Sequence, residues 1–344
     1  MHQTENTSIS NSLSNSTLEM VGSPILTLAL PVIYLLVFMF STPCNLISLW
    51  LLCCHTKHKN PTIIFAINLA LTDLLYSIFL PFQIAYHFRG NDWPFGDAMC
   101  SVVTVIFYGN MHCSILTTCA ISLERYWGIV RPLRTKHWRT GAKAALCCLL
   151  IWVCVLVVHI SLLYNRLTFR VSQLNVTTCF DIIPKSVFPD RIMGYVYFGA
   201  VLLLFFVLPL FVLVGCYTVI IWKLHASRDL DTPQRAKRQT MLLIVVVVLC
   251  FLCCYLPNIV LQFLHMVYVS RGKSLYIYYK LSLGLNSLNS CFDPFIYYFA
   301  SREFRQKFRS KLFCTASEHE ETTSSELANL SKGASTETGN LPKK

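Results

Sequence analysis

An uncharged, largely apolar run, residues 99–123, ends in the polar triplet Glu124, Arg125 and Tyr126. An arginine stays ionised, so at the end of an apolar segment it needs water or an acidic partner. The adjacent Glu124 can supply that partner through an ion pair that can later be broken. The triplet therefore has the chemistry of an electrostatic switch. The alternative is a simple anchor at a membrane boundary, because arginine side chains often extend from helix ends toward water.

Two carboxylates lie inside otherwise uncharged segments, Asp73 within residues 61–86 and Asp293 within residues 281–299. A carboxylate in an apolar environment must be paired, protonated or bound to a cation. Hydroxyl and amide side chains accompany them, and oxygen ligands suit a hard cation. We therefore predict a sodium site formed by Asp73, Ser114, Asn289 and Asp293. A structural hydrogen-bond network between helices is the alternative.

The composition requires a bilayer as the solvent. With 54% hydrophobic residues, 13% charged residues and a mean hydropathy of +0.52, the chain would expose large apolar areas in water. A helix needs about 20 residues to cross the hydrocarbon core. Seven segments qualify, at roughly residues 25–54, 61–86, 99–123, 144–164, 193–222, 240–269 and 281–299. Because lipid offers no hydrogen bonds to an open backbone, we predict an all-α integral membrane protein with a seven-transmembrane helix bundle.

The distribution of Lys and Arg predicts the orientation. The first 56 residues contain none of the 29 basic residues, whereas basic loops follow the first, third, fifth and seventh segments. By the positive-inside rule, the amino terminus lies outside and those loops lie in the cytoplasm. The glycosylation sequons at Asn6, Asn15 and Asn175 then lie outside. The net charge of +12 reflects this topology and attraction to anionic membrane lipids, not nucleic-acid binding. We expect the protein at the plasma membrane, with the first segment as an uncleaved signal.

Most of the 16 cysteines lie within the apolar segments, where they act as small packing residues. Cys100 and Cys179 lie on the outer side, where an oxidising environment allows them to pair. We predict a disulfide between them, which would hold the loop of residues 165–191 over the bundle. Cys314 follows a basic segment on the cytoplasmic side and is a candidate for lipidation.

Motifs along the chain resemble those of class A (rhodopsin-like) G-protein-coupled receptors. The resemblance covers roughly residues 25–313 and is carried, in order, by Asn45, residues 68–73 (NLALTD), Glu124-Arg125-Tyr126, Trp152, Pro209, Tyr217, residues 251–257 (FLCCYLP) and residues 293–297 (DPFIY). It implies that an extracellular ligand shifts the helix packing, that the sixth helix moves about Pro257, and that a heterotrimeric G protein binds the opened cytoplasmic face. The implied activation residues are Glu124, Arg125, Tyr126, Tyr217, Phe251, Tyr255, Pro257, Asp293, Pro294 and Tyr297.

Within that family the chain is most similar to the purinoceptor-like branch. Asp293 before Pro294, and residues 93–96 (WPFG) before Cys100, are typical of this branch. Two positions differ from the usual patterns. Lys237 stands where many members have an acidic partner for the switch arginine, so a salt bridge between the third and sixth helices is excluded. Gln262 stands where nucleotide-binding members carry a basic residue, which makes nucleotide recognition doubtful.

Basic and aromatic residues near the outer ends of the helices indicate the ligand. Arg170 and Lys280 lie on the outer side, together with histidines such as His265 and aromatic residues such as Tyr108 and Tyr279. A basic vestibule over an aromatic cavity favours a small anion with an apolar or ring portion, either nucleotide-like or lipid-like. We predict that these five residues bind the ligand. Solvated loop charges are the alternative for each basic residue.

The remaining segments complete the expected organisation. Residues 1–24 form an extracellular glycosylated segment, residues 25–300 the receptor domain, residues 301–313 an amphipathic membrane-surface helix and residues 314–344 a disordered cytoplasmic tail. Phosphorylation of the tail at residues 322–325 would allow arrestin to bind.

A transporter or channel is the main alternative function, but the chain lacks visible internal repeats. A retinal protein would need a lysine in the middle of the seventh segment, and no paired catalytic groups indicate an enzyme.

Overall fold

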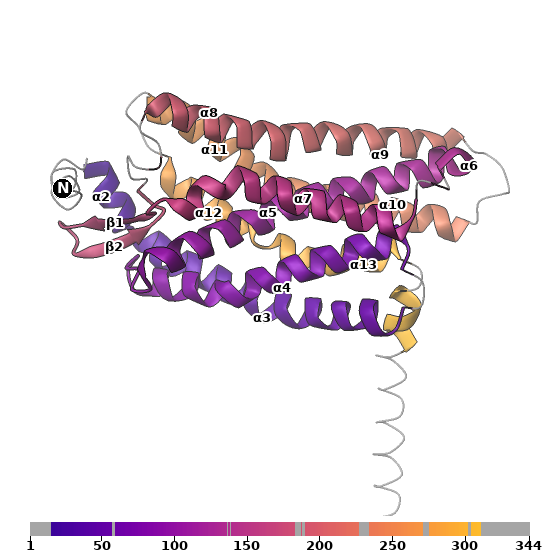
Figure 1. Ribbon diagram of the computed structural model, residues 1–344, viewed down its shortest axis with the longest axis horizontal. Helices are drawn as coiled ribbons and strands as arrows, with labels where there is room; N and C mark the ends of the chain where they lie inside the picture. The colour runs from indigo at the N-terminus through magenta and orange to yellow at the C-terminus, as the bar shows by residue number, and fades with distance from the viewer. Residues whose placement is uncertain are drawn as a thin grey trace, which may run out of the picture.

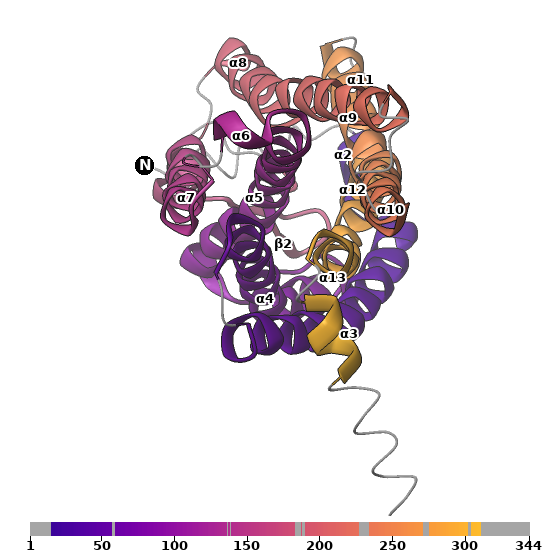
Figure 2. The ribbon, with the colours of Figure 1, turned by 90° about the vertical axis from the view of Figure 1, so that its right-hand side faces the viewer.

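The computed structural model describes residues 15–56, 59–135, 137, 139–182, 187, 190–226, 234–270, 275–301 and 304–310. Among the predicted sites, Asn6, Cys314 and the tail lie outside these residues. The described chain forms a long bundle of helices, shown from the side in Figure 1 and end-on in Figure 2. Every one of the seven predicted apolar segments lies within helices of this bundle.

The first four spans are single helices. They are α3 (Pro24–Cys54), α4 (Pro61–Phe88), α5 (Gly96–Val130) and α7 (Gly141–Tyr164), with the short α6 (Pro132–Thr135) between the last two. Local sequence explains where they begin. Proline occupies the first turn of α3 and α4, where its missing N–H costs nothing. The side chains of Asn60 and Thr140 accept hydrogen bonds from the backbone N–H of Ile63 and Lys143, which caps α4 and α7.

The fifth and sixth spans each contain a π-helical turn before a proline. The fifth comprises α8 (Arg191–Leu202), η1 (Leu203–Val207) and α9 (Leu208–Ala226), and the sixth comprises α10 (Gln234–Cys250), η2 (Phe251–Tyr255) and α11 (Leu256–Ser270). Proline removes one backbone hydrogen bond and crowds the preceding turn, so the helix widens just before it. Pro209 and Pro257 each lie just beyond the end of such a turn. The sixth span therefore has a local irregularity at the predicted pivot.

The seventh span is divided into two helices, α12 (Tyr276–Asn286) and α13 (Asn289–Ala300). A turn at Ser287 and Leu288 separates them. Six helices in the described part of the chain are long and apolar enough to cross a membrane. The seventh span is not among those six because the turn leaves two helices of 11 and 12 residues. Beyond it, residues 304–310 form a further helical segment whose Phe304 is buried.

A small antiparallel sheet, which the sequence analysis did not anticipate, lies at one end of the bundle. Its strands are β1 (Thr168–Val171) and β2 (Val176–Cys179), with Thr168 opposite Cys179. Asn175 in the connecting turn has a φ of 52°, a conformation that Asn tolerates better than most residues. The sheet, together with α2 (Asn15–Val21), marks one end of the bundle in Figure 1.

The disulfide between Cys100 and Cys179 fixes this sheet to the bundle. Cys100 lies in the first turns of α5, and Cys179 ends β2. The residues that follow Cys179 are therefore held above the centre of the helices. Leucine, valine and phenylalanine side chains are exposed along the outer faces of the spans, for example Leu28, Phe40, Val157 and Phe211, as expected for surfaces that face lipid.

Candidate functional site

A cavity of about 320 Å³ opens at the end of the bundle that carries the sheet. Its walls are built by the helices α2, α5, α8, α11 and α12 and by the loop after β2. The lining residues are Thr17, Met20, Tyr108, Phe180, Asp181, Ile182, Phe198, Gln262, His265, Met266, Tyr276 and Tyr279. Three of the five predicted ligand-binding residues line it: Tyr108, His265 and Tyr279. The hydroxyls of Tyr108 and Tyr279 lie 3.3 Å apart, and the rings of His265 and Tyr279 stack. The cavity is thus predominantly aromatic and can hold a small organic ligand.

Lys280 lies beside this cavity and forms a buried ion pair with Asp181. Both side chains are largely shielded from solvent, at 12% and 5% exposure. The hydroxyls of Tyr86 and Tyr276 also donate to the carboxylate of Asp181, at 2.5 and 2.6 Å. Burial alone would raise the pKa of Asp181, but the charge of Lys280 and the hydrogen bonds from Lys280 and Tyr276 outweigh it, so the pKa lies below its usual value.

Asp181 is a site residue that the sequence analysis missed. Its position two residues after Cys179 was the available signal, because the predicted disulfide would hold the neighbouring residues over the bundle. Arg170, in contrast, is exposed on β1, and its guanidinium donates to the side chain of Asn175 at 2.8 Å. It is not among the residues that line the cavity. Of the two predicted anion-binding cations, only Lys280 lies beside it.

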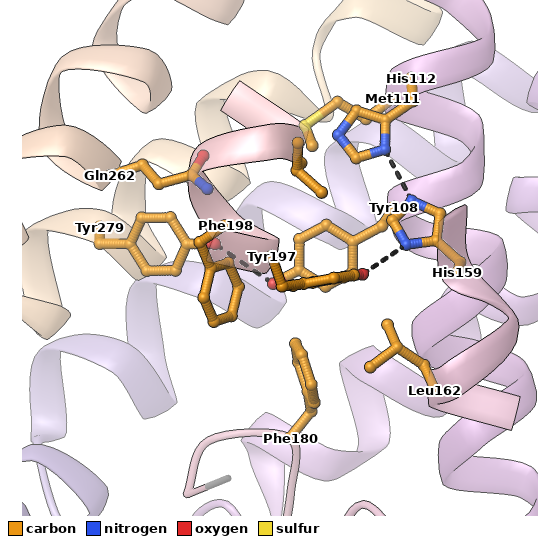
Figure 3. Close-up of a pocket in the computed structure, with 11 residues that line it drawn as sticks. Tyr108, Met111, His112, His159, Leu162, Phe180, Tyr197, Phe198, Gln262 and Tyr279 are labelled. Carbon is orange, nitrogen blue, oxygen red and sulfur yellow. Dashed lines mark hydrogen bonds between the residues drawn. The ribbon is translucent and has the colours of Figure 1, made fainter. Parts of the chain in front are cut away.

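A smaller chamber of about 20 Å³ lies below the main cavity and shares several wall residues with it. Figure 3 shows its lining, in which a hydrogen-bonded chain joins three spans. His112 Nδ1 lies 2.8 Å from His159 Nε2, and His159 Nδ1 lies 2.9 Å from the hydroxyl of Tyr197. Both histidines are buried, and His112 Nε2 has no hydrogen-bond partner among the described residues. This chain couples α5, α7 and α8 at the depth that a ligand would reach.

The predicted sodium-binding residues Asp73, Ser114, Asn289 and Asp293 are all buried within the bundle. Asn110 donates to Asp73 at 3.0 Å, and Asn289 donates to the hydroxyl of Tyr255 at the same distance. Several buried oxygens in the described bundle make no hydrogen bond, namely Asp73 Oδ2, Ser114 Oγ, Asn289 Oδ1 and both carboxylate oxygens of Asp293. Unsatisfied buried oxygens are costly, and a hard cation is the partner that such a donor set suits.

At the opposite end of the bundle, Glu124 is buried and shared between two arginines. Arg125 Nε lies 3.6 Å from Glu124 Oε2, and a second ion pair joins Glu124 Oε1 to Arg139. Thr62 on α4 completes the cluster, since its hydroxyl donates to Glu124 at 3.2 Å and accepts from Arg125 at 3.1 Å. The predicted Glu124–Arg125 pair is thus present, but Arg139 from the loop before α7 was not anticipated.

The other predicted activation residues lie on several spans of the bundle. The hydroxyl of Tyr217 on α9 lies 2.6 Å from Ser122 on α5, and that of Tyr297 on α13 donates to Asn45 on α3 at 3.4 Å. The rings of Phe251 and Tyr255 lie 5.7 Å apart within η2. Tyr126 is half-buried against the core, and Pro294 lies inside α13. These hydroxyl contacts join the third span to the fifth and the first span to the seventh.

Comparison with known proteins gives a consistent result. Residues 44–297 match the family model described as "7 transmembrane receptor (rhodopsin family)". The chain is 42% identical over 303 residues to the S-geranylgeranyl-glutathione receptor of Homo sapiens, covering 87% of this chain and 84% of that relative. It is 41% identical over 297 residues to purinoceptor 8 of Gallus gallus, with coverage of 86% and 83%. Proteinase-activated receptor 2 of Rattus norvegicus is 38% identical over 291 residues, with coverage of 84% and 72%.

Proposed function

Because this chain belongs to the rhodopsin family of seven-transmembrane receptors, we propose that its outer cavity binds an extracellular anion that carries a long apolar portion. The family membership itself means that the protein is a multi-pass G-protein-coupled receptor of the plasma membrane, with an extracellular ligand and a heterotrimeric G protein as partners. It is a signalling receptor rather than an enzyme, and the transporter alternative is not favoured. The nature of the ligand is the proposal.

The buried ion pair beside the aromatic cavity supports an amphiphilic anion most directly. The apolar portion of such a ligand fits the aromatic walls around Tyr108 and Tyr279. An anionic group approaching Lys280 would compete with Asp181 for the ammonium and release the loop after β2. The name of one relative includes S-geranylgeranyl-glutathione, a compound that joins carboxylates to a long apolar chain, and this ligand class agrees with the proposal. Arg170 enters the proposal only as an exposed charge that attracts an anion.

The orientation and the remaining partners are part of the same proposal. The amino terminus lies outside, since α2 and the turn of Asn175 share the end of the bundle that carries the ligand cavity (Figure 1). Asn15, at the start of α2, and Asn175 are the glycosylation positions within the described chain. On the inner side, the helical residues 304–310 lie against membrane lipids, and the phosphorylated tail binds arrestin. A sodium ion is bound between Asp73 and Asp293.

Nucleotide exchange on a heterotrimeric G protein tests the ligand proposal. The purified full-length receptor in lipid nanodiscs is exposed in turn to S-geranylgeranyl-glutathione, a lysophospholipid and ATP. The two amphiphilic anions are expected to accelerate exchange, whereas ATP, which lacks a long apolar portion, does not. Stimulation by ATP alone would contradict the proposal.

Two variants that each remove one positive charge test where the anionic group of the ligand binds. Lys280→Gln removes the ammonium beside the cavity and is expected to lower the potency of an active amphiphile about tenfold, because one charge-assisted contact is lost. Arg170→Gln removes an exposed charge of the same sign and is expected to change potency by less than about twofold. Equal potency for the wild type and Lys280→Gln would show that the anion does not reach this residue.

The Arg139 ion pair leads to a prediction about basal activity. Arg139→Ala frees one carboxylate oxygen of Glu124, which can then bind Arg125 more fully and stabilise the resting state. Ligand-independent exchange is expected to fall about two- to fivefold, the range for a partly exposed ion pair. Arg134→Ala, on the neighbouring α6, serves as the control because Arg134 is exposed. An increase in basal exchange with Arg139→Ala would mean that Arg139 restrains the receptor instead.

A further inference from the structure

The inner end of the sixth span needs a restraint other than a salt bridge to Arg125. Lys237, in the first turns of α10, carries the same charge as Arg125 and cannot pair with it. Two residues further along α10, the side-chain oxygen of Gln239 accepts a hydrogen bond of 2.7 Å from Arg305 Nη2. Arg305 belongs to the helical residues 304–310, so this bond connects the sixth span to the segment that follows the seventh.

Arg305 is held in place from the side of the seventh span. Its Nη1 donates to the backbone carbonyls of Tyr298 and Phe299, at 2.9 and 3.0 Å. These carbonyls belong to the last turn of α13, where helical carbonyls lack intrahelical partners and where a cation is favoured by the helix dipole. The guanidinium therefore caps α13 with one nitrogen and reaches α10 with another, a division that its fork geometry allows.

The neighbouring residue fixes the position of the whole segment. Phe304 is 2% exposed and its ring lies edge-on to that of Tyr297, with centroids 6.5 Å apart. Tyr297 is in turn bonded to Asn45 on α3. Arg305 is thus attached to a rigid base formed by the first and seventh spans. Its bonds to Tyr298 and Phe299 stay within that base, whereas its bond to Gln239 crosses to the sixth span.

We propose that Arg305 is a latch that holds the inner end of the sixth span against the seventh in the resting receptor. An outward displacement of α10 separates Gln239 from Arg305 but leaves the two carbonyl bonds to α13 intact. The bond is therefore present in the closed bundle and absent in the open one, so it contributes only to the resting state. Arg305 is a positioning residue, which acts through Gln239 on the conformational equilibrium and not through contact with the ligand.

Basal nucleotide exchange, measured with the full-length receptor in nanodiscs and without ligand, tests the latch. Gln239→Ala removes the acceptor while leaving the cap of α13 in place, so it is the informative variant. Its basal exchange is expected to rise about three- to tenfold, the range for loss of one typical intramolecular hydrogen bond at a part-buried site. Arg309→Gln, an exposed cation on the same helical segment, is the matched control and is expected to leave basal exchange unchanged.

A conservative replacement separates a latch from a general packing role. Gln239→Glu replaces a neutral acceptor with a charged one, strengthens the bond to Arg305 and is expected to reduce basal exchange below that of the wild type. A packing role would make both Gln239 variants behave alike. The latch is overturned if Gln239→Ala matches Arg309→Gln in basal exchange, or if Gln239→Glu raises basal exchange. Because no ligand is added, failure of the ligand proposal does not affect this result.

Discussion

Replacing Arg125 with alanine is expected to abolish G-protein activation, with at least about a tenfold loss of ligand-stimulated nucleotide exchange. Arg125 lies at the inner end of α5 and is held by Glu124 and by Thr62 on α4. Its side chain is 25% exposed, so part of it reaches the surface at this end of the bundle, where we propose that the G protein binds. An arginine that leaves its carboxylate offers several hydrogen-bond donors to the incoming partner, and alanine offers none. Losing a charged contact at the centre of an interface commonly costs about 2 kcal/mol or more, roughly a 30-fold change in affinity.

Surface expression and a neighbouring arginine provide the controls for this experiment. Arg125→Ala should still reach the membrane, because removing Arg125 leaves Glu124 paired with Arg139. Arg134→Ala, at an exposed position on α6, should keep normal exchange. If Arg125→Ala couples like the wild type at equal surface expression, Arg125 is only a boundary anchor, the alternative that the sequence left open.

Asp181→Asn is expected to cause a large loss of stability. The variant leaves the buried ammonium of Lys280 without its ion-pair partner, and breaking a buried pair from one side costs about 3–5 kcal/mol. Thermal unfolding of the purified receptor in detergent, followed at neutral pH, measures this loss. The double variant Asp181→Asn/Lys280→Met removes both charges and should recover much of it. Asp190→Asn, at an exposed position before α8, is the control.

The same carboxylate predicts how stability depends on pH. Burial opposes ionisation of Asp181, but Lys280 and the hydroxyl of Tyr276 lower its pKa in the folded protein below the ordinary value of about 3.9. The unfolded chain therefore takes up a proton at this site before the folded protein does as the pH falls. The stabilisation is complete at neutral pH and is lost below about pH 4, as the pH passes through the lowered pKa. Asp181→Asn should show a weaker acid dependence in this range than Asp190→Asn.

The sequence predicted the helical bundle well because each span carries its own signal. Apolar length alone located the helices, and the motifs placed residues such as Asp73, Arg125 and Pro257 on the right elements. The ion pair of Glu124 with Arg125 follows from their adjacency. The burial of Tyr108 and Tyr279 around one cavity follows from the outer position of both residues in their spans. These features depend on local pattern, which a single sequence contains.

The features that could not be predicted from the sequence depend on how the loops fold back onto the helix bundle. Asp181 and Arg139 lie in loops, and the sequence does not state which buried charge a loop residue will reach. The two short strands were missed because a search for long apolar segments passes over four-residue elements. Arg170 was expected in the ligand site because of its charge, yet strand pairing directs it to Asn175. In each case tertiary contacts, rather than local composition, decide the outcome.

The short helix α2, at the start of the described chain, is expected to influence how fast a ligand enters and leaves the cavity. Thr17 and Met20 form part of the cavity wall, and the carbonyl of Val21 accepts a bond of 2.6 Å from Asn91 in the turn after α4. A molecule bound in the cavity would therefore lie against this segment. Its dwell time is therefore sensitive to changes at α2, such as a sugar on Asn15 or removal of the Asn91 bond, even when every residue that contacts the bound molecule deeper in the bundle stays the same.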